Sequence, residues 1–171
     1  LNTELGIPFR TPAEGHNVAF TSLWDNYPDS LEIPLKGKAS RAYLLMAGST
    51  NHMQCHIDNG VIRIYYKDGT RDVMFLRNPD NWPPIEHIFF EDGLAFNRHT
   101  PALYRLRLKT GEISNNFGEE LGFPGASREL DGGAAVLLEM PLNPGKKLSH
   151  LVLETLSNDV VIGLMSITLQ R

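Results

Sequence analysis

This sequence has almost no cysteine and no long apolar run. Cys55 is the single cysteine among 171 residues, so the chain cannot form an internal disulfide. No apolar run approaches the roughly 18 residues that a membrane-spanning helix needs. Hydrophobic residues make up 42% and charged residues 21%, which is typical of a globular protein. We therefore expect one folded domain whose stability comes from a hydrophobic core.

An excess of positive charge is also missing. The formal net charge is −4, with 16 Lys and Arg against 20 Asp and Glu. Nucleic acids and anionic membranes bind to concentrated basic surfaces, so neither is expected as a partner. Residue 1 is Leu, and no charged segment leading into an apolar one follows it. The sequence thus predicts a mature form or an excised piece of a longer protein.

Helical periodicity is missing as well, apart from a short helical turn that residues 87–96 would allow. The strands predicted from the sequence are 17–22, 31–36, 41–47, 61–66, 72–76, 102–108, 112–116, 134–140, 148–156 and 160–169. Short strands without crossover helices favour an all-β fold, an antiparallel β-sandwich or jelly roll with about eight to ten strands. The sandwich would span residues 17–171, after an N-terminal extension or linker at 1–16.

The strongest strand signals lie between residues 41 and 86. Asp68-Gly69 separates two β-rich runs, and both residues tolerate the positive φ of a tight hairpin turn. Arg63 and Tyr65 should point outward from their strand, where they would be solvated or dock an anionic sugar or a neighbouring domain. Strict alternation in 103–109 puts Tyr104, Leu106 and Leu108 on one face and Arg105, Arg107 and Lys109 on the other, wet face.

Loop lengths predict where a binding surface would lie. If successive strands run antiparallel, the connections alternate between the two ends of the sandwich. One end would hold the short links 37–40, 67–71, 109–111 and 141–147, and the other would hold 23–30, 48–60, 77–101, 117–133 and 157–159. Long loops on a rigid sandwich usually carry the binding surface. A missed strand would reverse every later loop.

Aromatic and amide side chains occur together in these long loops. Sugars bind to such mixtures, because their C–H faces stack on aromatic rings while amides and carboxylates take the hydroxyls. The ligand-binding residues predicted on this basis are Trp24, Asp25, Asn26, Tyr27, Asn51, Asn81 and Trp82. In the alternative interpretation, the two tryptophans fill the ends of the core, and Asp25 and Asn26 shape turns.

Metal-ligand patterns are present but incomplete. His52 and His56 have the spacing that puts two imidazoles on one face of a helix, and Cys55 lies between them. They fall in a loop with no further cluster after it, so no zinc site is predicted. Oxygen ligands that would suit Ca²⁺ occur at Asp58-Asn59 and at Asp68, Thr70 and Asp72. Turn formation explains the same residues; a structural Ca²⁺ ion stays open, and no other cofactor is expected.

Catalytic motifs are missing from the sequence. It contains no G-x-S-x-G elbow, no Gly-rich phosphate loop before a helix and no defensible Cys/His pair. Glu86 with Glu91 or Asp92 would supply the two carboxyl groups that glycoside hydrolysis requires. A sequence does not give the separation of these groups, and we assign no catalytic residue.

Four segments resemble a known kind of domain. They are residues 20–29 (FTSLWDNYPD), 43–51 (YLLMAGSTN), 66–70 (YKDGT) and 153–164 (LETLSNDVVIGL). The chain resembles, over about residues 17–171, a β-sandwich domain of unknown function found near the C-terminus of large bacterial glycoside hydrolases. It is broadly similar to galactose-binding-domain-like jelly rolls. The resemblance implies a carbohydrate-related context and an extracytoplasmic location (periplasmic, cell-surface or secreted), and it supplies no binding residues.

Three hypotheses for the function follow. The first is a non-catalytic accessory or carbohydrate-binding module of a secreted polysaccharide-degrading enzyme. The second is a structural domain that packs on a catalytic domain of the same parent chain and binds no sugar, which predicts an extensive apolar patch. The third is a glycoside hydrolase in its own right; whether the chain is an enzyme is thus left open, and an accessory role is preferred.

Overall fold

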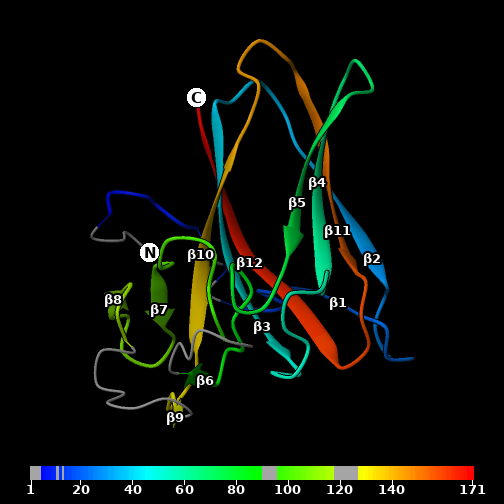
Figure 1. The fold of residues 1–171 in the computed structure, drawn as a ribbon. Coiled ribbons are helices and arrows are strands. Elements are labelled where there is room, and N and C mark those ends of the chain that lie inside the picture. Colours follow the sequence, from blue (N-terminus) through cyan, green and yellow to red (C-terminus); the bar gives the residue numbers. More distant parts are fainter. Residues whose placement is uncertain (1–4, 11, 13, 90–95, 118–126) are drawn as a thin grey trace.

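The computed structural model describes residues 5–10, 12, 14–89, 96–117 and 127–171, and within them the chain forms twelve strands and no helix (Figure 1). The strands are β1 (Ala19–Ser22), β2 (Ser30–Pro34), β3 (Arg41–Thr50), β4 (Gly60–Tyr66), β5 (Arg71–Leu76), β6 (His87–Phe89), β7 (Arg105–Arg107), β8 (Ile113–Ser114), β9 (Ser127–Glu129), β10 (Ala134–Pro141), β11 (Leu148–Thr155) and β12 (Val160–Gln170). All ten predicted strands form at the expected places. Within the described residues, no helix is long and apolar enough to cross a membrane.

The strands form two facing antiparallel sheets, with orders β1-β12-β3-β10-β7-β8 and β2-β11-β4-β5 (Figure 1). Successive long strands alternate between the sheets except for the β4–β5 hairpin, and the orders 1-12-3-10 and 2-11-4-5 are those of an eight-stranded jelly roll. The short strands β7 and β8 extend the first sheet beyond β10, and β6 pairs with β9 in a separate ribbon. The predicted all-β sandwich is confirmed.

The core lies between the two sheets and follows from the alternation of apolar residues along each strand. Leu44 and Met46 of β3 face Ile62 and Ile64 of β4 within one cluster, and all four are fully buried. Burial of each such side chain contributes about 1.5–3 kcal/mol. Residues at the intervening positions point to the opposite face of the strand, and in β3 that face is apolar and buried as well.

A second apolar cluster covers the outer face of the larger sheet. Phe9 is buried there against Leu45 and Ala47 of β3. The hydroxyl of Ser166 in β12 donates to the carbonyl oxygen of Arg10 at 2.9 Å. Residues 7–10 of the N-terminal extension therefore pack on the sheet, while the division of the chain at residue 17 stays a prediction.

Strand registers place the long loops at one end of the sandwich. Thr50 at the end of β3 lies opposite Val160 at the start of β12, and Gly60 at the start of β4 lies opposite Leu76 at the end of β5. Loops 23–29, 51–59 and 156–159 and the start of 77–86 thus share this end, as predicted. The links 35–40, 67–70 and 142–147 gather at the opposite end, at the top of Figure 1.

The link 108–112 contradicts its prediction. Arg107 at the end of β7 pairs with Ala134 at the start of β10, which puts this link at the long-loop end. The reason is a missed strand: residues 87–89 form β6 rather than a helical turn, and residues 90–95 lie outside the described part of the chain. Because each strand reverses the chain direction, this extra strand reverses the assignment of the link 108–112, and a second missed strand, β9, restores the assignment of the link 142–147.

The wet face predicted for β7 is also corrected. Arg105 is only 8% exposed, whereas Tyr104 and Leu108 are each 39% exposed. The Arg105 guanidinium donates to the carbonyl oxygens of Pro84 at 2.8 Å and of His87 at 3.0 Å. Burial lowers the pKa of Arg105 to about 10, and the Glu86 carboxylate partly counters that shift. Hydrogen bonds to these carbonyl oxygens therefore stabilise the buried arginine. A pattern of alternating residues cannot reveal such partners.

Candidate functional site

The tryptophan of the loop after β5 lies in the core. Trp82 is 1% exposed and belongs to the cluster between the sheets. A Cβ atom at Gly48 would come within 2.8 Å of the Trp82 ring, so the indole and the β3 backbone are in close contact. Its ring has no face in solvent on which a sugar could stack. The structure therefore favours the alternative interpretation of Trp82, as a residue that closes the core.

Two of the three predicted asparagine ligands, Asn51 and Asn81, form hydrogen bonds within their own loops. The Asn81 side chain accepts from the backbone N–H of Arg77 at 2.8 Å and donates to the carbonyl oxygen of Phe75 at 2.9 Å. The Asn51 side chain accepts from the backbone N–H of Met53 at 3.0 Å. Both residues shape turns, and Asn81 has its acceptor and one donor engaged there.

The loop between β1 and β2 presents aromatic rings to solvent. Trp24 is 51% exposed, and its ring centroid lies 6.4 Å from that of Tyr27. The ring of Phe20, in β1, is in an edge-on arrangement with that of Tyr27, also at a centroid distance of 6.4 Å. We call Phe20, Trp24 and Tyr27 the aromatic cluster. Asp25 and Asn26 are exposed beside it in the same turn.

This turn is closed by its own backbone. The N–H of Tyr27 donates to the carbonyl oxygen of Trp24 at 2.9 Å, and the N–H of Ser22 donates to that of Pro28 at 3.1 Å. The Ser22 hydroxyl in turn donates to the carbonyl oxygen of Val160 at 2.7 Å, which attaches the turn to the sheet. The aromatic rings are thus held by a rigid support, which lowers the entropic cost of binding a ligand on them.

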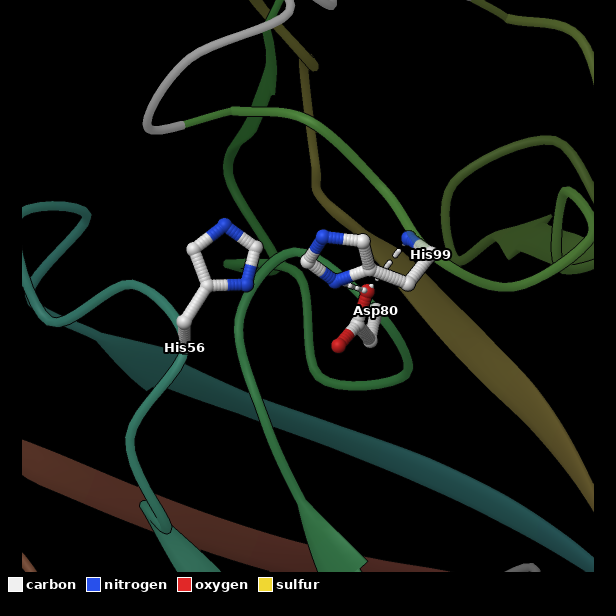
Figure 2. A group of neighbouring side chains, drawn as sticks. All are labelled: His56, Asp80 and His99. Carbon is white, nitrogen blue, oxygen red and sulfur yellow. Dashed lines mark hydrogen bonds and ion pairs between the residues drawn. The ribbon is translucent and has the colours of Figure 1, made fainter.

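A second group of polar side chains, two imidazoles and one carboxylate, lies at loop 51–59. His56, Asp80 and His99 come from three separate segments, and their ligand atoms all lie within 4.8 Å of one another (Figure 2). His99 Nδ1 is 3.4 Å from Asp80 Oδ1, and the two imidazole centroids are 4.7 Å apart. Figure 2 shows both rings directed toward each other with the carboxylate beside them. We call these three residues the His–Asp–His cluster.

The backbone around this cluster is tied together. His56 N–H donates to the carbonyl oxygen of Asn78 at 2.7 Å, which joins loop 51–59 to the segment that carries Asp80. His99 N–H donates to Asp80 Oδ1 at 2.7 Å, and the Thr100 hydroxyl donates to the Asp80 carbonyl oxygen at 2.7 Å. His56 has a φ of 56°, a left-handed conformation that is uncommon outside glycine. The surrounding contacts hold it there.

The sequence pattern around His52 did not reveal this cluster. His56 belongs to it, but its neighbours in space are Asp80 and His99, and the group formed by the described residues does not include His52. Cys55 donates from Sγ to the His52 carbonyl oxygen at 3.0 Å. No local signal marked Asp80 or His99, because these two residues are 19 positions apart and approach only in the folded chain.

The acidic positions considered for Ca²⁺ have protein partners. Asp68 Oδ1 accepts from the Thr70 backbone and hydroxyl at 3.0 and 2.6 Å, and the Lys146 ammonium lies 3.0 Å from Oδ2. These bonds lower the pKa of Asp68 to about 2. Asp58 pairs with Arg77 at 2.5 Å. The turn interpretation accounts for both positions.

The carboxylate considered for glycoside hydrolysis has structural contacts. Glu86 accepts a hydrogen bond from the Ser49 hydroxyl at 3.1 Å, and its charge counters the burial of Arg105. Its two suggested partners, Glu91 and Asp92, lie outside the described residues. The structure thus describes no second carboxyl group for Glu86 from that pair.

A largely apolar pocket of about 540 Å³ opens beside the sandwich. Its walls come from the N-terminal segment, β3, β5, β10 and residues 100–104: Leu5, Ile7, Tyr43, Met74, Asn81, Thr100, Pro101, Ala102, Leu103, Tyr104, Leu137, Leu138 and Glu139. Asn81 and Thr100 directly follow Asp80 and His99 in the sequence. The pocket and the His–Asp–His cluster therefore share two chain segments.

Comparison with known proteins identifies no relative: no protein-family model, no curated protein and no solved structure matches the chain. The functional interpretation therefore depends on the residues themselves and on the resemblance of the four sequence segments described above.

Proposed function

We propose that this chain is a non-catalytic carbohydrate-binding module, an accessory domain of a secreted bacterial glycoside hydrolase. The observation that carries the proposal is the aromatic cluster, in which Trp24 is 51% exposed and Tyr27 is 38% exposed. Single exposed apolar side chains are common, but neighbouring exposed rings form a patch, and such patches often mark a binding surface. The C–H faces of a sugar would stack on Trp24 and Tyr27.

Polar groups at the edge of the aromatic cluster would give the site its selectivity. Asp25 and Asn26 are exposed in the same turn, and a carboxylate and an amide offer acceptors and donors for sugar hydroxyls. Asn51, Asn81 and Trp82 no longer belong to the proposed contact surface, because their side chains shape loops or fill the core. The proposed site is thus a small platform on one loop.

The test is a screen for glycan binding followed by a matched pair of variants. Plant and host polysaccharides are screened by affinity electrophoresis, and the retained glycan is titrated calorimetrically into wild type, Trp24→Ala and Phe75→Ala. Phe75 is a suitable control, because it is 42% exposed on β5, outside the proposed platform. We expect Trp24→Ala to weaken binding about tenfold or more, which corresponds to 1.4 kcal/mol. Equal affinity of all three proteins would reject the proposed site.

A second candidate function is a structural domain that packs on the catalytic domain of the same parent chain. The apolar pocket favours it, since Leu5, Ile7 and Leu137 lie in its walls and apolar surface of this kind is typical of docking sites. Deleting the domain from the parent chain would then lower the solubility or activity of the remainder. Unchanged behaviour of the shortened parent would count against this function.

Turnover by the chain itself is the third candidate. Purified protein would have to cleave aryl glycosides, and Glu86→Gln would have to abolish the cleavage. The contacts of Glu86 with Ser49 and Arg105 favour a structural role for this carboxylate, so we place the enzyme hypothesis last.

A further inference from the structure

We infer that His56, Asp80 and His99 form a binding site for a divalent transition-metal ion, with Zn²⁺ as the ion that fits best. The ion would join His56 of loop 51–59 to Asp80 and His99, whose following residues, Asn81 and Thr100, line the apolar pocket. This inference is independent of the proposed carbohydrate site, because none of its residues belongs to the aromatic cluster.

The donor set selects the class of metal. The group offers two imidazole nitrogens and one carboxylate oxygen. Ca²⁺ and Mg²⁺ prefer sites built from oxygen ligands, whereas imidazole with carboxylate suits Zn²⁺ and its transition-metal neighbours. Three protein ligands leave one position of a tetrahedral zinc ion for water.

The distances fit such an ion with little movement. Zinc binds imidazole nitrogen and carboxylate oxygen at about 2.0–2.2 Å, so two ligands of a tetrahedral ion lie roughly 3.3–3.5 Å apart. His99 Nδ1 and Asp80 Oδ1 are already 3.4 Å apart. The remaining ligand atoms lie within 4.8 Å, so the His56 ring would move by roughly 1.5 Å or less. His56 is exposed, and a change of its side-chain torsions supplies that movement.

The backbone contacts hold the ligands in place before a metal binds. Asp80 accepts the backbone N–H of His99, and the backbone N–H of His56 is bound to the Asn78 carbonyl oxygen. The Asp80 side chain is 15% exposed, whereas that of His99 is 60% exposed. The carboxylate is thus fixed and shielded, and the exposed imidazole leaves a route for an ion to enter.

Charges around the cluster also allow a cation to bind. Arg77 lies near enough to Asp80 for the carboxylate to raise its pKa, but Asp58 is the larger cause, through a hydrogen bond of 2.5 Å. The Asp58–Arg77 pair is neutral as a unit. The charge of Asp80 therefore remains available to a metal ion.

The test uses Zn²⁺ in competition with a chromogenic zinc chelator and protein without a polyhistidine tag. Wild type is expected to bind one equivalent, and Asp80→Asn and His99→Gln are each expected to weaken binding at least tenfold. Asp80→Asn keeps an acceptor for the His99 N–H, so it removes the charge with the smallest change in the loop. Circular dichroism and thermal unfolding without metal verify that each variant is folded.

His52→Gln is the matched control, because His52 lies in the same loop four residues before His56. It should leave zinc binding unchanged. Failure of wild type to take zinc from the chelator would overturn the inference, and so would a loss in His52→Gln as large as that in His99→Gln. Visible absorption of the Co²⁺-loaded wild type gives a second readout: a tetrahedral spectrum lost in Asp80→Asn supports the site, and the same spectrum in both proteins contradicts it.

Discussion

The two tryptophans of the chain lie in loops at the same end of the sandwich, and the structure gives them opposite environments. Trp24 is 51% exposed in the loop after β1, whereas Trp82 is 1% exposed in the loop after β5. The first belongs to a turn closed by its own backbone, and the second fills the core beside Gly48. Residue type and loop membership are thus insufficient to identify a binding residue; what surrounds the side chain decides its role.

The largest expected effect is the loss of stability in Trp82→Ala. Truncating this buried indole leaves a cavity at the end of the core and should lower the free energy of unfolding by about 3–5 kcal/mol. Trp24→Ala is the matched control, for which we expect a change within about 0.5 kcal/mol. Urea unfolding followed by circular dichroism measures both. Equal losses in the two variants would remove the distinction between the tryptophans.

Gly48→Ala tests the contact between Trp82 and β3 by changing the β3 residue instead of the tryptophan. A methyl group there would overlap the carbonyl oxygen of Val161 and come within 2.8 Å of the Trp82 ring. Because one of these neighbours is backbone of β12, we expect a loss of about 2 kcal/mol or more. The urea midpoint of this variant gives the value. Gly69→Ala is the reference for a cost of backbone conformation alone, because Gly69 has a φ of 85° and its Cβ would meet no atom within 4 Å; the loss in Gly48→Ala should exceed the loss in Gly69→Ala. An unperturbed Gly48→Ala protein would show that Trp82 packs loosely.

The end of the sandwich that holds the links 35–40, 67–70 and 142–147 contains no proposed site. It therefore serves as a reference for the end that holds the long loops. Burial, with the hydrogen bond to Asp72 as the next cause, raises the pKa of Tyr66 to about 12. The ordinary value is 10.0, so in this range the unfolded chain loses the phenolic proton before the folded chain does. The stabilisation from Tyr66 is complete below pH 10 and is lost as the pH rises to about 12.

We expect this loss to be on the order of 1 kcal/mol, and Tyr66→Phe should remove it from the pH profile of unfolding. The measurement is urea unfolding at pH values between 9 and 12. Since the turn at 67–70 carries no proposed ligand contact, the variant should bind zinc and glycan as wild type does. Altered binding would show that the two ends of the sandwich are coupled.

The smallest expected effect is that of the polar edge of the aromatic cluster. Asn26→Ala should weaken glycan binding by about two- to tenfold, the equivalent of one hydrogen bond, without a change in the urea midpoint. Asn51→Ala is the control, because its side chain accepts from the Met53 backbone. A larger loss of binding in Asn51→Ala than in Asn26→Ala would move the proposed site toward loop 51–59.

Most of the fold could be predicted because its signals are local. Alternating apolar residues located ten strands, and Asp68-Gly69 located the hairpin between β4 and β5. The short strands β6 and β9 were missed, since three residues carry no usable period and their partners are far apart in the chain. Arg105 was predicted to be solvent-exposed but is buried, because its hydrogen-bond partners are carbonyl groups of residues far from it in the sequence.

The two candidate sites also differ in how far they could be predicted from the sequence. Two of the three rings of the aromatic cluster, Trp24 and Tyr27, were among the predicted residues because they stand with Asp25 and Asn26 in one loop; Phe20 was not. The His–Asp–His cluster was not, because His56, Asp80 and His99 approach only when three segments fold together. The spacing of His52 and His56 pointed to a helical pairing that has no helix to support it.

The most direct test of the proposed function uses the fact that the chain has only two tryptophans. Their two indole N–H signals are recorded by ¹H–¹⁵N NMR while the glycan from the screen is added. The proposed function predicts that the Trp24 signal shifts saturably and that the Trp82 signal stays in place. A shift of the Trp82 signal with the Trp24 signal unchanged would contradict it.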